Sequence, residues 1–145
     1  MLAVQAENFD VAELTTSLYD AAKNVGAVAT FVGIVRADAV VKALELSHYP
    51  GMSEQSLALI AGEANARWPL AAVSIIHRVG KLLPGEQIVY VGTASAHRQA
   101  ALEACAYIAD QLKTRAVIWK KEHLVDGTRW VEPSEQDVAV AAQWR

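Results

Sequence analysis

The stretch that decides the fold is AAVSIIHRVGKLLPGEQIVYVGTAS, residues 71–95. Two runs rich in β-branched and other apolar residues, 71–80 and 86–95, flank the segment KLLPGE. The Pro-Gly step in that segment is a standard turn signal. We therefore expect two strands that follow each other directly in an antiparallel sheet.

A second hairpin is expected near the end of the chain. Asp126-Gly127 separates the runs AVIWKKEHLV, 116–125, and TRWVE, 128–132. This dipeptide suits the tight turns that join antiparallel strands, and it is the strongest short-range hairpin signal in the sequence.

Three segments with apolar residues at helical spacing lie between the predicted strands: 11–23, 54–68 and 96–115. Each follows a residue type that favours a helix N-terminus. The expected N-caps are Asp10, Ser53 and Ser95. Pro69 is expected to end the second helix.

The remaining predicted strands are 2–9, 26–36 and 40–49. The run GAVATFVGIVR, 26–36, has the composition of a buried strand, and the alternating segment 40–49 is expected to be its partner. Strict β-α-β alternation is missing, so the fold class indicated is an α+β sandwich with a largely antiparallel sheet. We expect residues 1–145 to form one domain, with 133–145 as a C-terminal tail or a short helix.

Composition limits the classes of function. With 53% hydrophobic and 20% charged residues the chain folds as a globular protein, and a net charge of −3 argues against nucleic-acid binding. Neither a signal peptide nor an apolar run of about 18 residues is visible, so no membrane association is expected. A single cysteine, Cys105, excludes an intrachain disulfide and suits the cytoplasm. We expect Cys105 to be a small core residue rather than a catalytic thiol.

Motifs for metals and nucleotides are missing from the sequence. The four histidines, at 48, 77, 97 and 123, lack partners at ligand spacing, and no Gly-rich phosphate loop occurs. We therefore expect neither a metal ion nor another cofactor.

Five basic residues remain as candidates for anion binding: Arg36, His97, Arg98, Lys113 and Lys120. His97 and Arg98 in the first turn of the long helix, where backbone N–H groups are free, could clamp a phosphate or carboxylate. An exposed polar pair explains them equally well. Lys113 also suits a helix C-terminus, Lys120 an exposed strand edge, and Arg36 the solvated end of a strand.

Helix length separates two of these candidates. Arg98 and Lys113 are 15 positions apart on one predicted helix, which corresponds to roughly 22 Å and exceeds the span of a small ligand. If both serve one site, they come from two copies of the helix. A site shared across a homodimer is the simplest arrangement.

Seven segments also resemble those of a known family, in the same order and at the same spacing. They are GAVATFVGIVR, HYPGM, RWPL, IIHRVGKLLPGE, VYVGTASAHRQAAL, QLKTRAVIWKKE and RWVE. On these segments the chain resembles the catalytic (large) subunit of molybdopterin synthase over nearly its whole length.

The resemblance implies a fold and a reaction. The fold would be an α/β hammerhead with an additional antiparallel β-hairpin subdomain. The reaction would transfer sulfur to cyclic pyranopterin monophosphate, giving the dithiolene of molybdopterin. Sulfur would arrive as the C-terminal Gly-Gly thiocarboxylate of a small ubiquitin-like partner. The assembly would be a heterotetramer built on a homodimer of large subunits.

The resemblance also implies roles for the five basic residues. Lys113 and Lys120 match the family's two essential lysines, and we expect Lys113 to act as acid, base or nucleophile and Lys120 to bind an anion. Arg36, His97 and Arg98 match substrate-binding positions, the last two supplied by the neighbouring subunit. Arg115 and Lys121 are expected at the rim.

One segment departs from the family pattern. The loop RADAVVKALEL after residue 35 is shorter than usual and has no glycine, so the placement of Arg36 is open. Two other functions are compatible with the residues. One is a non-catalytic module that docks a ubiquitin-like tail, and the other is a phosphate-ester enzyme that uses His97 and Arg98 within one subunit.

Overall fold

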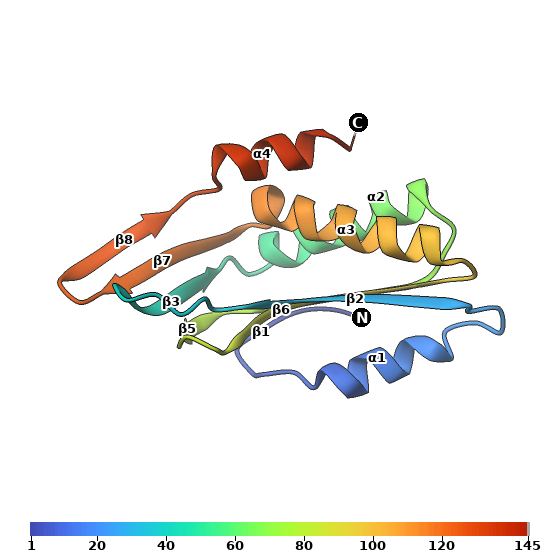
Figure 1. Cartoon of the computed structure of the whole chain (residues 1–145), viewed down its shortest axis with the longest axis horizontal. Coiled ribbons are helices and arrows are strands. Elements are labelled where there is room, and N and C mark those ends of the chain that lie inside the picture. The colour runs from blue at the N-terminus through green and yellow to red at the C-terminus, as the bar shows by residue number, and fades with distance from the viewer. Residues whose placement is uncertain (145) are drawn as a thin grey trace.

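Two four-stranded sheets and four helices make up residues 1–144, the part of the chain that this computed structural model describes (Figure 1). The first sheet has the order β1-β4-β6-β2 and the second the order β5-β3-β7-β8. The strands of the first sheet are β1 (Leu2–Gln5), β2 (Ala27–Ile34), β4 (Leu70–Arg78) and β6 (Gln87–Ser95). Those of the second are β3 (Val41–His48), β5 (Gly80–Leu82), β7 (Ile118–Leu124) and β8 (Gly127–Val131).

The helices are α1 (Val11–Tyr19), α2 (Met52–Arg67), α3 (Arg98–Arg115) and α4 (Glu135–Ala142). Only β1 and β4 pair in parallel, and every other strand pair found within residues 1–144 is antiparallel. The predicted α+β class with a largely antiparallel sheet is therefore confirmed. Both predicted pairings are present: β4 with β6, and β7 with β8 around Gly127.

The main core lies between the first sheet and helices α2 and α3, while α1 covers the opposite face (Figure 1). Neighbouring residues of the central strand β6 show this division. Val91 packs in the α2–α3 core, and Tyr90 faces α1, where its hydroxyl pairs with that of Thr15 at 3.0 Å. Cys105 is buried in the same core, as expected, and burial raises the pKa of its thiol to about 11.

Two strand predictions need correction. The run 26–36 is not a buried strand: β2 lies at the edge of the first sheet, and most of its side chains keep solvent contact. Nor is 40–49 its partner, because β3 joins the second sheet between β5 and β7. The short β5 was not predicted. Gly80, with φ of +98°, lets the chain turn out of β4 and pair with β3.

Two of the three predicted N-caps are wrong. Asp10 caps α1 as expected, its carboxylate accepting the Glu13 N–H at 3.0 Å. Gly51 rather than Ser53 precedes α2, and His97 rather than Ser95 precedes α3. Both serines bond elsewhere.

The C-terminal segment includes α4, which lies along α3 (Figure 1). Gln111 donates to the Ala141 carbonyl at 3.0 Å, and the Trp144 indole donates to Asp110 at 2.7 Å. Over residues 1–144, no helix combines the length and apolar composition that crossing a membrane would require.

Candidate functional site

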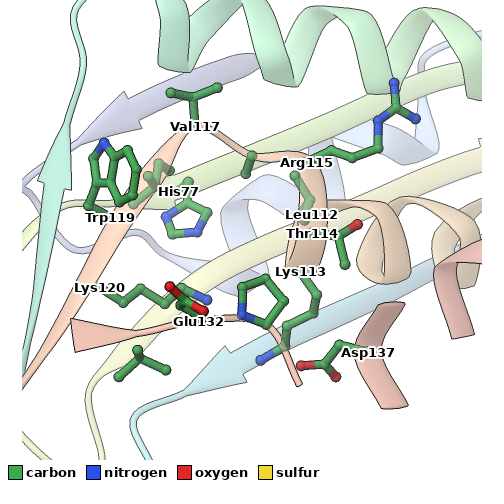
Figure 2. A pocket seen from close by; sticks show the side chains of 14 residues that line it. His77, Leu112, Lys113, Thr114, Arg115, Val117, Trp119, Lys120, Glu132 and Asp137 are labelled. Carbon is green, nitrogen blue, oxygen red and sulfur yellow. The ribbon is translucent and has the colours of Figure 1, made fainter. Parts of the chain in front are cut away.

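A cavity of about 350 Å³ opens where the C-terminal end of α3 meets both sheets (Figure 2). Its walls come from β4, the end of α3, the start of β7, the segment after β8 and the first turn of α4. The polar and charged lining residues are His77, Lys113, Thr114, Arg115, Lys120, Glu132 and Asp137. The cavity therefore joins parts of the chain that are up to 60 residues apart (137 − 77).

Lys113 and Lys120 reach this cavity from two successive elements. Lys113 stands in the last turn of α3, and Lys120 is the third residue of β7. The helix ends at Arg115 because Ala116 adopts an extended backbone, with φ of −68° and ψ of 129°. The chain then turns directly into β7, and the two amino groups point into one space (Figure 2).

Two buried serines of α2 hold the junction between α3 and β7. The Ser53 hydroxyl donates to the Val117 carbonyl, and the Ser56 hydroxyl accepts the Val117 N–H at 3.1 Å. Val117 lies between the two lysines in sequence. These bonds therefore fix the direction in which β7 leaves α3, and with it the approach of Lys120 to Lys113.

The main electrostatic feature of the cavity is the lowered pKa of Lys120. Burial, followed by the positive charge of Lys113, lowers the pKa of Lys120 to about 8, although the negative charge of Asp137 acts in the opposite direction. A lysine with such a pKa holds a mixture of amine and ammonium near neutral pH. It can bind an anion in one form and exchange a proton between the two.

Sequence reasoning missed four polar or charged residues of this cavity: His77, Thr114, Glu132 and Asp137. His77 has no metal-ligand partner at a suitable spacing in the sequence, and Asp137 falls in a segment predicted as a tail or short helix. Hydrogen bonds from Ser134, together with the charges of both lysines, hold the pKa of Asp137 below its ordinary value. His77 and Asp137 meet the lysines only through long-range packing, and no local pattern signals it.

The other predicted site residues lie elsewhere in this chain. His97 and Arg98 belong to a shallow surface depression at the N-terminal end of α3, the end opposite Lys113. Arg36 is exposed after β2 and is not part of the cavity lining. One chain thus brings together the two predicted catalytic lysines and none of the three predicted substrate-binding residues.

The two remaining cations have structural contacts. Arg115, at the cavity edge, forms a two-pronged ion pair with Glu63, with N–O distances of 2.6 and 2.8 Å. Lys121 points to the other face of β7, with its amino group 4.8 Å from the centre of the Trp130 ring. Because each side chain already has a partner for its positive charge, neither Arg115 nor Lys121 is a free cation of the cavity.

Comparisons with known proteins agree with one another. Residues 4–115 match the protein-family model described as "MoaE protein". The molybdopterin synthase catalytic subunits of Mesorhizobium japonicum and Pseudomonas aeruginosa are each 49% identical to this chain. The first alignment covers 98% of this chain and 91% of the relative, and the second covers 99% and 97%. The solved molybdopterin biosynthesis MoaE protein from Burkholderia ambifaria is 46% identical, with a TM-score of 0.85 over 98% of this chain and 95% of that one.

Proposed function

The chain belongs to the MoaE family of molybdopterin synthase catalytic subunits, sulfurtransferases of molybdenum cofactor biosynthesis, and from this premise we propose its reaction. It transfers sulfur from the C-terminal thiocarboxylate of a small ubiquitin-like subunit to cyclic pyranopterin monophosphate. The product is the dithiolene of molybdopterin. The cavity that holds Lys113 and Lys120 is the proposed site of transfer.

The observation that carries this proposal is the pair of lysines in one partly dry cavity. Both reactants are anionic, one through its thiocarboxylate and the other through its phosphate. Two ammonium groups attract both, and they stabilise the negative charge that develops as sulfur attacks. Cys105 is buried in the core and takes no part, because the sulfur comes from the partner.

The electrostatics favour one division of labour between the lysines. A general acid works best when its pKa lies near the working pH, and the pKa of Lys120 is lowered to about 8. We therefore assign proton transfer to Lys120 and anion binding to Lys113, the reverse of the assignment made from the sequence.

Loss of activity in single variants tests the proposal. The protein is combined with the thiocarboxylated partner and the precursor, and dithiolene product is measured for Lys113→Ala, Lys120→Ala and the matched control Lys121→Ala. Lys121 lies on the same strand and faces away from the cavity, so only the first two variants should lose activity. Near-normal product formation in both, with the proteins folded, would leave only a module that docks the partner's tail.

His97 and Arg98 enter the proposal through a second copy of the chain. They lie at the opposite end of α3 from Lys113, so one subunit cannot offer all three to one ligand. We propose a homodimer in which each site receives this pair from the neighbouring subunit, with a small subunit bound to each large one. We also propose that Arg36 binds the substrate, although it lies outside the cavity lining of a single chain.

Mixed dimers test the shared site. A chain with Arg98→Ala and a chain with Lys113→Ala are each inactive alone, but a mixed dimer should regain one intact site of its two. If the mixture stays inactive although the mixed dimer forms, the shared site is wrong. We further propose a cytoplasmic location, supported by the single, free and buried cysteine.

A further inference from the structure

His77 is the least exposed ionisable residue of the cavity wall. It lies near the end of β4 in the first sheet, beside Val4 of β1 and Val89 of β6. Only 4% of its surface is accessible, yet its ring lines the cavity together with both lysines (Figure 2). In a ring buried to this extent within a central strand, a nitrogen normally either has a hydrogen-bond partner or keeps contact with a solvent-filled space.

The hydrogen bond of one ring nitrogen settles the tautomer. His77 Nδ1 lies 2.9 Å from the backbone carbonyl oxygen of Arg78. A carbonyl oxygen only accepts, so Nδ1 carries the hydrogen and donates it. In the neutral ring Nε2 is then a pure acceptor. Within residues 1–144 Nε2 has no hydrogen-bond partner. Because no fully buried side-chain nitrogen or oxygen in these residues lacks a partner, Nε2 opens onto the cavity and is not sealed in the core.

The surroundings of the ring keep it neutral. Burial, together with the charges of Lys120 and Lys113, lowers the pKa of His77 to about 4, although the hydrogen bond to the Arg78 carbonyl acts in the opposite direction. Two carboxylates, Glu132 and Asp137, also line the cavity, and Asp137 is a counter-charge to the two lysines. A protonated ring would be a third cation beside those lysines.

We propose that His77 is a substrate-binding residue whose Nε2 accepts a hydrogen bond from a neutral N–H or O–H group of the pyranopterin. This inference rests on the proposed function and extends it from the anionic parts of the substrate to its uncharged ring system. The lone pair of Nε2 repels phosphate and thiocarboxylate, which the lysines attract. Within one cavity the lysines thus bind the anionic groups, and His77 selects a donor on the pterin.

Two variants separate the two ring nitrogens. In His77→Asn the amide occupies the place of Nδ1 and can still donate to the Arg78 carbonyl, but nothing reaches the position of Nε2. In His77→Gln the amide oxygen reaches that position and restores the acceptor. Binding of cyclic pyranopterin monophosphate is measured by calorimetry on the complex with the unmodified, non-reactive small subunit.

The expected result is a Kd raised about 3- to 10-fold in His77→Asn, the range for one neutral hydrogen bond, and within about twofold of wild type in His77→Gln. Because the ring stays neutral, the ratio of variant to wild-type Kd should not change between pH 6 and 8.5. The affinity for the small subunit should be unaltered in both variants.

Three results would overturn the inference. One is an unchanged Kd in His77→Asn, with or without a loss of kcat. Another is an equal loss in both variants, which would indicate packing alone. The third is a Kd ratio that changes through pH 6.5. If the wild-type protein forms no product with the thiocarboxylated partner, the proposed function fails and this inference fails with it. Product formation by wild type together with an unchanged Kd in His77→Asn refutes the inference alone.

Discussion

Replacing Lys120 by methionine should stabilise the fold while it abolishes activity. Methionine keeps the unbranched apolar stem and removes the charge. A fall in the pKa from 10.5 to about 8 corresponds to roughly 3 kcal/mol of free energy by which the folded protein disfavours the ammonium form. Part of that cost is relieved by contact with solvent in the open cavity, so we expect Lys120→Met to raise the free energy of unfolding by about 1–3 kcal/mol at pH 7.

The pH dependence of this gain identifies its source. Below pH 8 Lys120 is charged in the folded and the unfolded chain, and the folded state carries the full penalty. Between about pH 8 and 10.5 the folded protein loses the proton before the unfolded chain does, so wild-type stability rises and the penalty shrinks. The advantage of Lys120→Met should therefore fall to about a third of its pH 7 value by pH 10.

Urea unfolding of both proteins at pH 7 and pH 10, at equal chain concentration, measures the effect. Lys121→Met is the matched control: it removes the charge over the Trp130 ring and should cost about 0.5 kcal/mol at either pH. The reasoning is refuted if Lys120→Met is less stable than wild type at pH 7, or if its gain is the same at both pH values.

Three further outcomes follow from the contacts described. Asp137→Asn removes the charge that favours the ammonium of Lys120, so the pH above which kcat declines should move below about 8, seen in a pH–rate profile. Glu63→Gln weakens the ion pair with Arg115 and should cost about 1–2 kcal/mol by urea unfolding, with kcat within twofold of wild type. Cys105→Ala should keep its activity, and Cys105 of the native protein should resist alkylation at pH 7.5, as mass spectrometry would show.

The parts of the fold that could be predicted are those governed by local chemistry. The Pro-Gly and Asp-Gly turns mark two strand pairs, and apolar spacing marks the first three helices. Sheet membership could not be predicted, because it depends on pairing between distant segments. Strand β5 has only three residues, too few for any period to show, and it exists because Gly80 turns the chain toward β3.

The same distinction between local and long-range structure applies to the residues of the cavity. Lys113 and Lys120 are seven residues apart, at the end of a helix and the start of the next strand, so their proximity follows from local structure. His77 and Asp137 join them only through the packing of β4 and α4 around that junction. A histidine in an apolar strand has no sequence signal for this role, since its partners in the sheet are hydrophobic.

The failed prediction for Ser53 shows how the fold positions the site. A serine after a Pro-Gly break would normally cap a helix, a contribution of about 1 kcal/mol. Here Gly51 is the N-cap residue of α2, and Ser53 and Ser56 instead form hydrogen bonds with both backbone groups of Val117. Without them these two groups would lie half-buried and unpaired where α3 passes into β7, the point that sets how Lys120 approaches Lys113. The preference of serine for a helix N-cap is therefore not met at the point on which the geometry of the cavity depends. Departures from local sequence preferences are expected at functional sites of this kind.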